Sequence, residues 1–179
     1  NHKNEVRKQL PHLPEHNIIA EPIGRNTAPC IGLANLFIQQ FDPKANVIVV
    51  PSDHLIKNHA EFKRIMNAGL KFVHEHGGIV TLGITPSHPE TGYGYIQFDP
   101  DKATDEPDGN EKIYKVKTFA EKPNLEVAKS FLASGDFLWN SGMFIFRADT
   151  MMDEMKISLA DVYESLMKLV PVLHSKDFD

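Results

Sequence analysis

The chain has 179 residues, of which 41% are hydrophobic and 24% charged, with a formal net charge of −5, as in an ordinary soluble globular domain. No overall basic charge points to a nucleic-acid partner, and no apolar run approaches the ~18 residues that a membrane-spanning helix needs. The single cysteine, Cys30, excludes an internal disulfide and fits a reducing compartment, so we predict a cytoplasmic protein with no membrane or nucleic-acid partner.

The N-terminal part begins on a helical pattern. Residues 3–10 predict the end of a helix that Pro11 and Pro14 break, and residues 17–20 predict a short strand. The chain has no initiator Met and no signal peptide, so we expect an internal piece of a longer protein.

The next segment predicts a loop followed by a helix. Pro22 and Gly24 shape the loop, and Asn26 or Thr27 caps a helix that runs to about residue 40. Cys30 falls in the first turn of this helix, where a thiol pKa can be lowered. No base lies nearby in the sequence, so a packed, inert thiol is the favoured interpretation.

The apolar run 47–50, which Pro51 stops, predicts a strand buried on both faces, as in a parallel sheet. Asp53 follows it, and in open α/β sheets ligands bind just outside the carboxyl ends of strands. A carboxylate there suits Mg²⁺. The alternative is that Ser52 or Asp53 merely caps the following helix, and this stretch alone favours neither interpretation.

The remaining elements follow from periodicity and turn residues. Because helical and strand patterns alternate over residues 17–84, we expect parallel βαβ units. After the central strand we predict a helix over 59–76, a strand over 79–84, a strand entered at 91–98, a surface loop over 99–112, a strand over 112–119, a helix over 124–134 ending at Gly135, a strand beginning at 144, and a helical tail over 151–173.

Two loops could recognise a base and a sugar. Glu21 can accept two hydrogen bonds from adjacent donors such as guanine N1–H and N2–H₂, although a capping loop explains its neighbours nearly as well. The glycines around Tyr93 would admit a sugar ring against the backbone, although a strained turn between strands is the simpler explanation.

A second pair of stretches could hold a sugar phosphate. Glu121 can bind sugar hydroxyls while Lys122 binds a phosphate as a point charge, and Asn140 offers both a donor and an acceptor. The alternatives are an exposed ion pair of little energetic value and a core aromatic residue, Trp139, with a turn behind it.

Five motifs stand in one order: Glu-Pro-Ile-Gly-Arg-Asn-Thr-Ala-Pro (21–29), Pro-Ser-Asp-His (51–54), Thr-Gly-Tyr-Gly-Tyr-Ile (91–96), Phe-Ala-Glu-Lys-Pro (119–123) and Trp-Asn-Ser-Gly-Met-Phe (139–144). Over residues 17–148 the sequence resembles the mannose-1-phosphate guanylyltransferases (GDP-mannose pyrophosphorylases), which belong to the sugar-phosphate nucleotidyltransferases. The resemblance implies an enzyme that transfers guanylyl from GTP to mannose 1-phosphate with Mg²⁺, giving GDP-mannose and pyrophosphate.

The resemblance also implies roles for residues. Asp53 would bind the metal and act in catalysis with Lys122. The substrate-binding residues would be Glu21, Gly24, Arg25, Asn26 and Thr27 for the nucleotide, with Arg25 serving either the triphosphate or the loop, and Tyr93, Gly94, Glu121, Asn140 and Gly142 for the sugar. A nucleotidyltransferase for another sugar phosphate, or a non-catalytic regulatory homologue, remains an alternative, and a homo-oligomer is compatible with the family.

The fold implied is α/β: a Rossmann-like, mixed, mostly parallel sheet flanked by helices, the nucleotide-diphospho-sugar transferase fold. We expect one partial domain, incomplete at both ends, with a βαβ part over 1–84, a sugar-binding part over 85–150 and a helical tail over 151–179. The glycine-rich phosphate loop and the second metal-binding Asp of the family have no match here, so we expect these 179 residues to be inactive alone.

Overall fold

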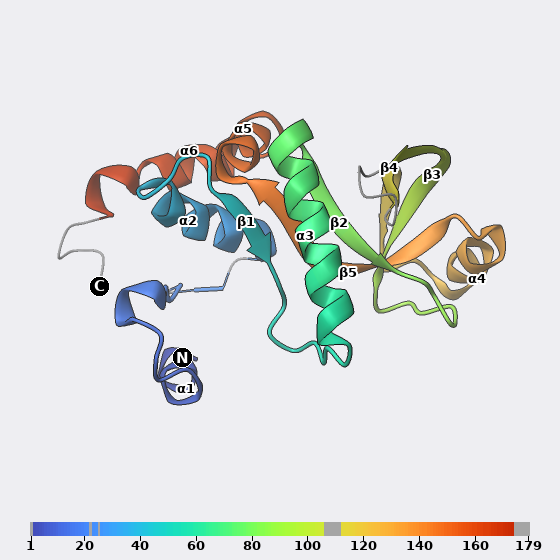
Figure 1. Ribbon diagram of the computed structural model, residues 1–179, viewed down its shortest axis with the longest axis horizontal. Helices are drawn as coiled ribbons and strands as arrows, with labels where there is room; N and C mark the ends of the chain where they lie inside the picture. Colours follow the sequence, from blue (N-terminus) through green and yellow to red (C-terminus); the bar gives the residue numbers. More distant parts are fainter. Residues whose placement is uncertain (1, 22, 25, 106–111, 174–179) are drawn as a thin grey trace. The chain divides into compact units, whose positions relative to one another are not determined.

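The computed structural model describes residues 2–21, 23–24, 26–105 and 112–173. The chain divides into two compact units, one formed by residues 46–150 and the other by residues 1–45 together with 151–179 (Figure 1). Each unit is described by itself below.

The first unit is helical. It contains α1 (Lys3–Gln9), the 3₁₀ turns η1 (Glu15–Asn17) and η2 (Val170–Val172), α2 (Thr27–Gln39), α6 (Ala160–Met167) and most of α5 (Ala148–Ser158). A Cβ built on Gly32 of α2 would lie 2.4 Å from Leu166 Cδ1, so this glycine lets α2 and α6 pack closely. The strand predicted at 17–20 is wrong, because a strand exists only with a partner and no described strand pairs with this segment.

The second unit is built on one sheet of five strands: β1 (Asn46–Val49), β2 (Ile79–Ile84), β3 (Gly94–Asp105), β4 (Lys112–Glu121) and β5 (Phe137–Arg147). β5, orange in Figure 1, is its central strand. β1 and β2 pair with opposite edges of β5, since Phe144 and Phe146 have partners in both. β3 pairs with the N-terminal part of β5 and with β4.

The fold is mixed α/β, but the expected mostly parallel sheet is wrong, because every pairing among the described strands is antiparallel. The pattern of strand, α3 (His59–His76) and strand did predict two strands that run the same way. Both β1 and β2 are antiparallel to β5, so they are parallel to each other, but β5 lies between them. β5 is far from β1 and β2 in the sequence, so local patterns could not predict that it lies between them.

The expectation that β1 is buried on both faces is also wrong. Ile48 is 37% exposed and Val50 51% exposed, and β1 lies at one end of the strand order. A short apolar run records β propensity as well as burial, and the run alone cannot separate the two.

α3 covers one face of β1, β5 and β2 (Figure 1). Its Met66 and Val73 form a core with Met143 and Ile145 of β5. A second core forms where Ala128 of α4 (Leu125–Ser134) packs with Tyr95 and Trp139.

Adding a methyl group at Gly69 is expected to destabilise this unit. A Cβ there would lie 2.4 Å from Ile145 Cδ1, and Ile145 is fully buried. Gly69→Ala should therefore lower the free energy of unfolding by about 1–3 kcal/mol, measured by urea denaturation. Asn67→Ala, at an exposed position of the same helix, is the control and should be neutral or slightly stabilising.

Local signals located most elements well. The helices predicted at 59–76 and 124–134 and the strand at 79–84 are confirmed, and Gly135 ends α4 in the left-handed conformation (φ 78°). β5 begins earlier than predicted, so the turn expected behind Trp139 is strand. β3 and β4 occupy both ends of the predicted loop 99–112, of which residues 106–111 lie outside the described residues.

Candidate active site

Asp53 lies in the loop that follows β1, as predicted. Its carboxylate is 87% exposed, with His54 Nε2 3.9 Å from Oδ1. The capping alternative is wrong for both Ser52 and Asp53, because Asn58 precedes α3 and its Oδ1 accepts from Glu61 N–H at 3.1 Å. Within the described ranges no hydrogen bond occupies the Asp53 carboxylate, so it is available to a ligand.

The predicted sugar residues of β3, β4 and β5 come together. Gly94 pairs with Glu121 across β3 and β4. A Cβ built on Gly94 would lie 2.9 Å from Glu121 Oε2 and 3.6 Å from Asn140 Cβ. We call Tyr93, Gly94, Glu121, Lys122, Asn140 and Gly142 the convergent cluster. A side chain larger than glycine at position 94 would occupy the space beside the carboxylate.

Lys122 has a strained backbone within the convergent cluster. Its φ is 45°, a left-handed value that non-glycine residues adopt at a cost. Its N–H donates to Tyr93 O at 3.2 Å, which ties the start of β3 to the end of β4. Its Nζ lies 3.6 Å from Glu121 Oε1, and both side chains are largely exposed, so this ion pair contributes little stability and both groups can turn to a ligand.

Asn140 and Gly142 connect the convergent cluster to the Asp53 loop. Asn140 Oδ1 accepts from Gly142 N–H at 3.0 Å and from Thr81 Oγ1 at 3.3 Å. Gly142 has φ 72°, and a Cβ there would lie 3.4 Å from Pro51 Cγ. Glycine adopts this backbone without strain, and the short distance to Pro51 places the loop that begins there against β5, beside the convergent cluster.

The loop before β3 is anchored by residues that sequence reasoning missed. Glu90 Oε1 accepts from Gly92 N–H at 2.7 Å, and the Glu90 carbonyl accepts from Tyr95 Oη at 2.8 Å. His88 and Tyr93 both contact the indole of Trp139. The only local signal was a carboxylate two residues before a glycine, which is too common to single out. The core interpretation of Trp139 is confirmed by its 9% exposure.

The predicted base loop lies in the first unit. Asn26 precedes α2 with φ 80° and ψ 175°, and its side chain makes no capping hydrogen bond; this backbone is strained for any residue but glycine. Gly24 and Thr27 are exposed, and Arg25 lies outside the described residues. The backbone conformation in which the loop enters α2 is therefore not one that the residue type of Asn26 favours.

Glu21 contacts Cys30 in the first turn of α2. Partial desolvation raises the pKa of the Cys30 thiol, although the residue is exposed overall, and the Glu21 carboxylate, which accepts from the S–H, raises it further. Cys30 is exposed, so the packed thiol expected from the sequence is wrong. The raised pKa nonetheless agrees with an unreactive thiol.

Removing the Glu21 charge is expected to make Cys30 more reactive. Glu21→Gln should lower the thiol pKa, increase the thiolate fraction at pH 8 and speed alkylation by iodoacetamide roughly two- to fivefold. The rate should rise with pH in both proteins, and the rise should begin at lower pH in the variant. Glu15→Gln is the control, because Glu15 does not act on the thiol; an equal acceleration there would contradict the Glu21 contact.

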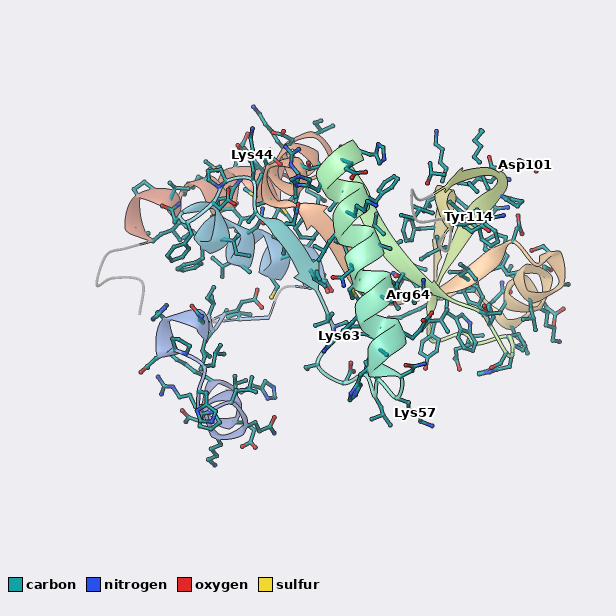
Figure 2. All side chains as sticks on the ribbon, in the orientation of Figure 1. Lys44, Lys57, Lys63, Arg64, Asp101 and Tyr114 are labelled. Atoms are coloured by element: carbon teal, nitrogen blue, oxygen red, sulfur yellow. The ribbon has the colours of Figure 1, made fainter. Side chains whose placement is uncertain are left out.

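An apolar groove of about 730 Å³ lies elsewhere in the second unit, lined by α3 and all strands but β1. Tyr114, labelled on β4 in Figure 2, is one of its walls. None of the convergent cluster lines it. Its apolar walls do not suit a phosphorylated sugar, so the groove is no candidate for the site.

Three comparisons bear on the chain. Residues 1–174 match the family model described as nucleotidyl transferase. The chain is 39% identical over 177 residues to the Escherichia coli protein named mannose-1-phosphate guanylyltransferase, covering 97% of this chain and 37% of that protein. It is 43% identical over 166 residues to the protein of that name from Salmonella montevideo, covering 92% and 34%.

A solved structure shares the fold. The Thermus thermophilus protein described as mannose-1-phosphate geranyltransferase superposes with a TM-score of 0.73 at 24% identity, over 94% of this chain and 54% of that chain. The chain spans about a third of the length of the Escherichia coli and Salmonella montevideo relatives described above. Separately, no helix within the described ranges combines the length and apolar character needed to cross a membrane.

Proposed function

The chain belongs to the nucleotidyl transferase family, and from this premise we propose that the protein transfers guanylyl from GTP to mannose 1-phosphate, giving GDP-mannose and pyrophosphate. The observation that carries the proposal is the convergence of Gly94, Glu121, Lys122 and Asn140 beside the loop of Asp53. The names of the relatives at 39% and 43% identity support the choice of guanylyl and mannose.

The convergent cluster would hold mannose 1-phosphate. Gly94 leaves room for the sugar against the backbone, and the Glu121 carboxylate accepts from its hydroxyl groups. The Lys122 ammonium binds the phosphate as a point charge. Asn140 Oδ1 is already engaged by Gly142 and Thr81, so its amide N–H groups would face the sugar. Tyr93 and Gly142 would border the same space.

In the proposed reaction the sugar phosphate oxygen attacks the α-phosphorus of GTP. That oxygen is anionic at neutral pH, so no side chain has to act as a nucleophile. The contribution of the chain is to orient the two phosphates and to compensate their charge. Lys122 does so for the attacking group, and the base loop of Glu21, Gly24, Asn26 and Thr27, with Arg25, would hold the nucleotide.

We propose Mg²⁺ as the cofactor. When bound, it would neutralise the charge shared by the two phosphates. Asp53 fits a magnesium ligand, because its carboxylate is exposed at the end of a strand and no described residue hydrogen-bonds it. The described residues contain no group of three His, Cys, Asp or Glu side chains that could hold a metal. One carboxylate together with substrate phosphates is a usual way to bind Mg²⁺.

The test is an assay of the full-length protein with Mg²⁺, GTP and mannose 1-phosphate, with GDP-mannose followed by chromatography. ATP, UTP and dTTP in place of GTP, and glucose 1-phosphate in place of mannose 1-phosphate, should give at least tenfold lower kcat/KM. A preference for another pair would support the alternative of a different sugar nucleotide. Binding without turnover would support a regulatory homologue. The cytoplasmic location and a homo-oligomer stay predictions.

A further inference from the structure

His88 links the loop before β3 to the middle of the sheet. Its imidazole meets the Trp139 indole edge to face, with ring centroids 5.0 Å apart at 71°. Tyr93 approaches the same indole at 5.4 Å and 81°. Edge-to-face pairs of this kind favour one relative orientation. The rings of His88 and Tyr93 are therefore both packed on Trp139, the residue that immediately precedes Asn140.

The His88 ring is also held at both nitrogens. Nε2 lies 3.3 Å from Glu90 Oε2, and Nδ1 lies 3.1 Å from Ser87 Oγ. The hydrogen bond from Gly92 N–H, and then the contact with His88, hold the pKa of Glu90 below its usual value. Glu90 is thus a charged acceptor at neutral pH. The ring cannot turn away from Trp139 without losing one of these bonds.

The contacts of His88 lead to the convergent cluster without touching it. Trp139 pairs with Tyr95 across β5 and β3, and Tyr95, fully buried, donates to the Glu90 carbonyl. Tyr93 O accepts from Lys122 N–H. If the loop left Trp139, Tyr93 would move and the backbone contact to Lys122 would change with it.

We propose that His88 is a positioning residue for the sugar phosphate: it keeps the loop of residues 88–93 on Trp139 and so sets the spacing between Tyr93, Gly94 and Lys122. This inference rests on the proposed function, since it takes the convergent cluster as the sugar-phosphate site. The contacts of His88 lead to Tyr93 and Lys122, so its replacement should affect the sugar phosphate more than GTP.

Trp139 is the only tryptophan of these 179 residues, and the emission that is lost in Trp139→Phe identifies its signal in the full-length protein. His88→Ala should change the emission of the unliganded full-length protein. It should also weaken mannose 1-phosphate roughly five- to tenfold, in a titration followed by Trp139 fluorescence and in KM, while the KM for GTP moves less than about twofold. His88→Phe keeps a ring on Trp139 and should restore the emission and part of the affinity.

His76 provides the matched control, because its ring contacts Phe72 of α3 at 4.9 Å and has no part in the loop. His76→Ala should leave emission and both KM values unchanged. The positioning role is overturned if His88→Ala binds mannose 1-phosphate as well as the unmodified protein does, if both KM values rise equally, or if His88→Phe behaves as His88→Ala. If the unmodified protein binds no mannose 1-phosphate, the proposed function itself fails.

Discussion

Asp53→Asn is expected to lower kcat of the full-length protein at least about a hundredfold, because the substitution removes a charge that the transition state of phosphoryl transfer needs. The carboxylate is 87% exposed and receives no hydrogen bond from a described residue. Its loss should therefore change the free energy of unfolding by less than about 0.5 kcal/mol. Turnover measured over a range of Mg²⁺ concentrations, together with urea denaturation, checks both expectations.

Asp153→Asn, an exposed aspartate of α5, is the control for this prediction and should leave turnover and stability unchanged. A variant at position 53 that kept near-normal turnover at saturating Mg²⁺ would remove the metal role from Asp53. A variant that lost turnover together with several kcal/mol of stability would make the effect one of folding, contrary to the exposed position.

Lys122→Ala should raise the KM for mannose 1-phosphate roughly tenfold or more, with a smaller change in the KM for GTP, because a charged hydrogen bond to phosphate is among the stronger contacts. If the contact strengthens in the transition state, kcat falls as well. Lys129→Ala is the control, since Lys129 forms a similar exposed ion pair, with Glu126 at 3.0 Å, away from the convergent cluster.

The left-handed backbone of Lys122 allows its side chain and its conformation to be tested separately. Lys122→Gly should lose the same affinity for mannose 1-phosphate as Lys122→Ala, because both lack the ammonium. It should be more stable than Lys122→Ala by about 1 kcal/mol, because glycine adopts φ 45° without strain. A change confined to the KM for GTP in both variants would assign Lys122 to the nucleotide.

The sequence predicted best what depends on neighbours in the chain. The bounds of α3 and β2 follow from periodicity and from glycines that end the helix. The direction and position of β5 depend on residues far from it, so the parallel sheet and the turn behind Trp139 were wrong. β1 also looked buried because its residues favour strands, whichever face they present.

The same distinction applies to the candidate site. Motif order singled out Asp53, Gly94, Glu121 and Asn140, and the last three lie together in the structure, although Asn140 lies within β5 and not in a turn. The strained backbone of Lys122 and the contacts of His88 could not be predicted. The strain is a property of a backbone angle, and the contacts depend on Trp139 of β5, which is far from His88 in the sequence. No residue pattern encodes either locally.

The central place of β5 has a consequence for synthesis of the protein. β1 and β2 both pair with β5 and not with each other, and β5 leaves the ribosome after both. Until β5 has emerged, the edges of these two strands have no partner among the described strands, whereas the helices that precede β5 and the β3–β4 hairpin can form from local contacts. Sheets that depend on such distant pairings close slowly. The nascent chain therefore passes through a period in which apolar strands are exposed, and a chaperone that binds extended apolar segments would find its targets in β1 and β2.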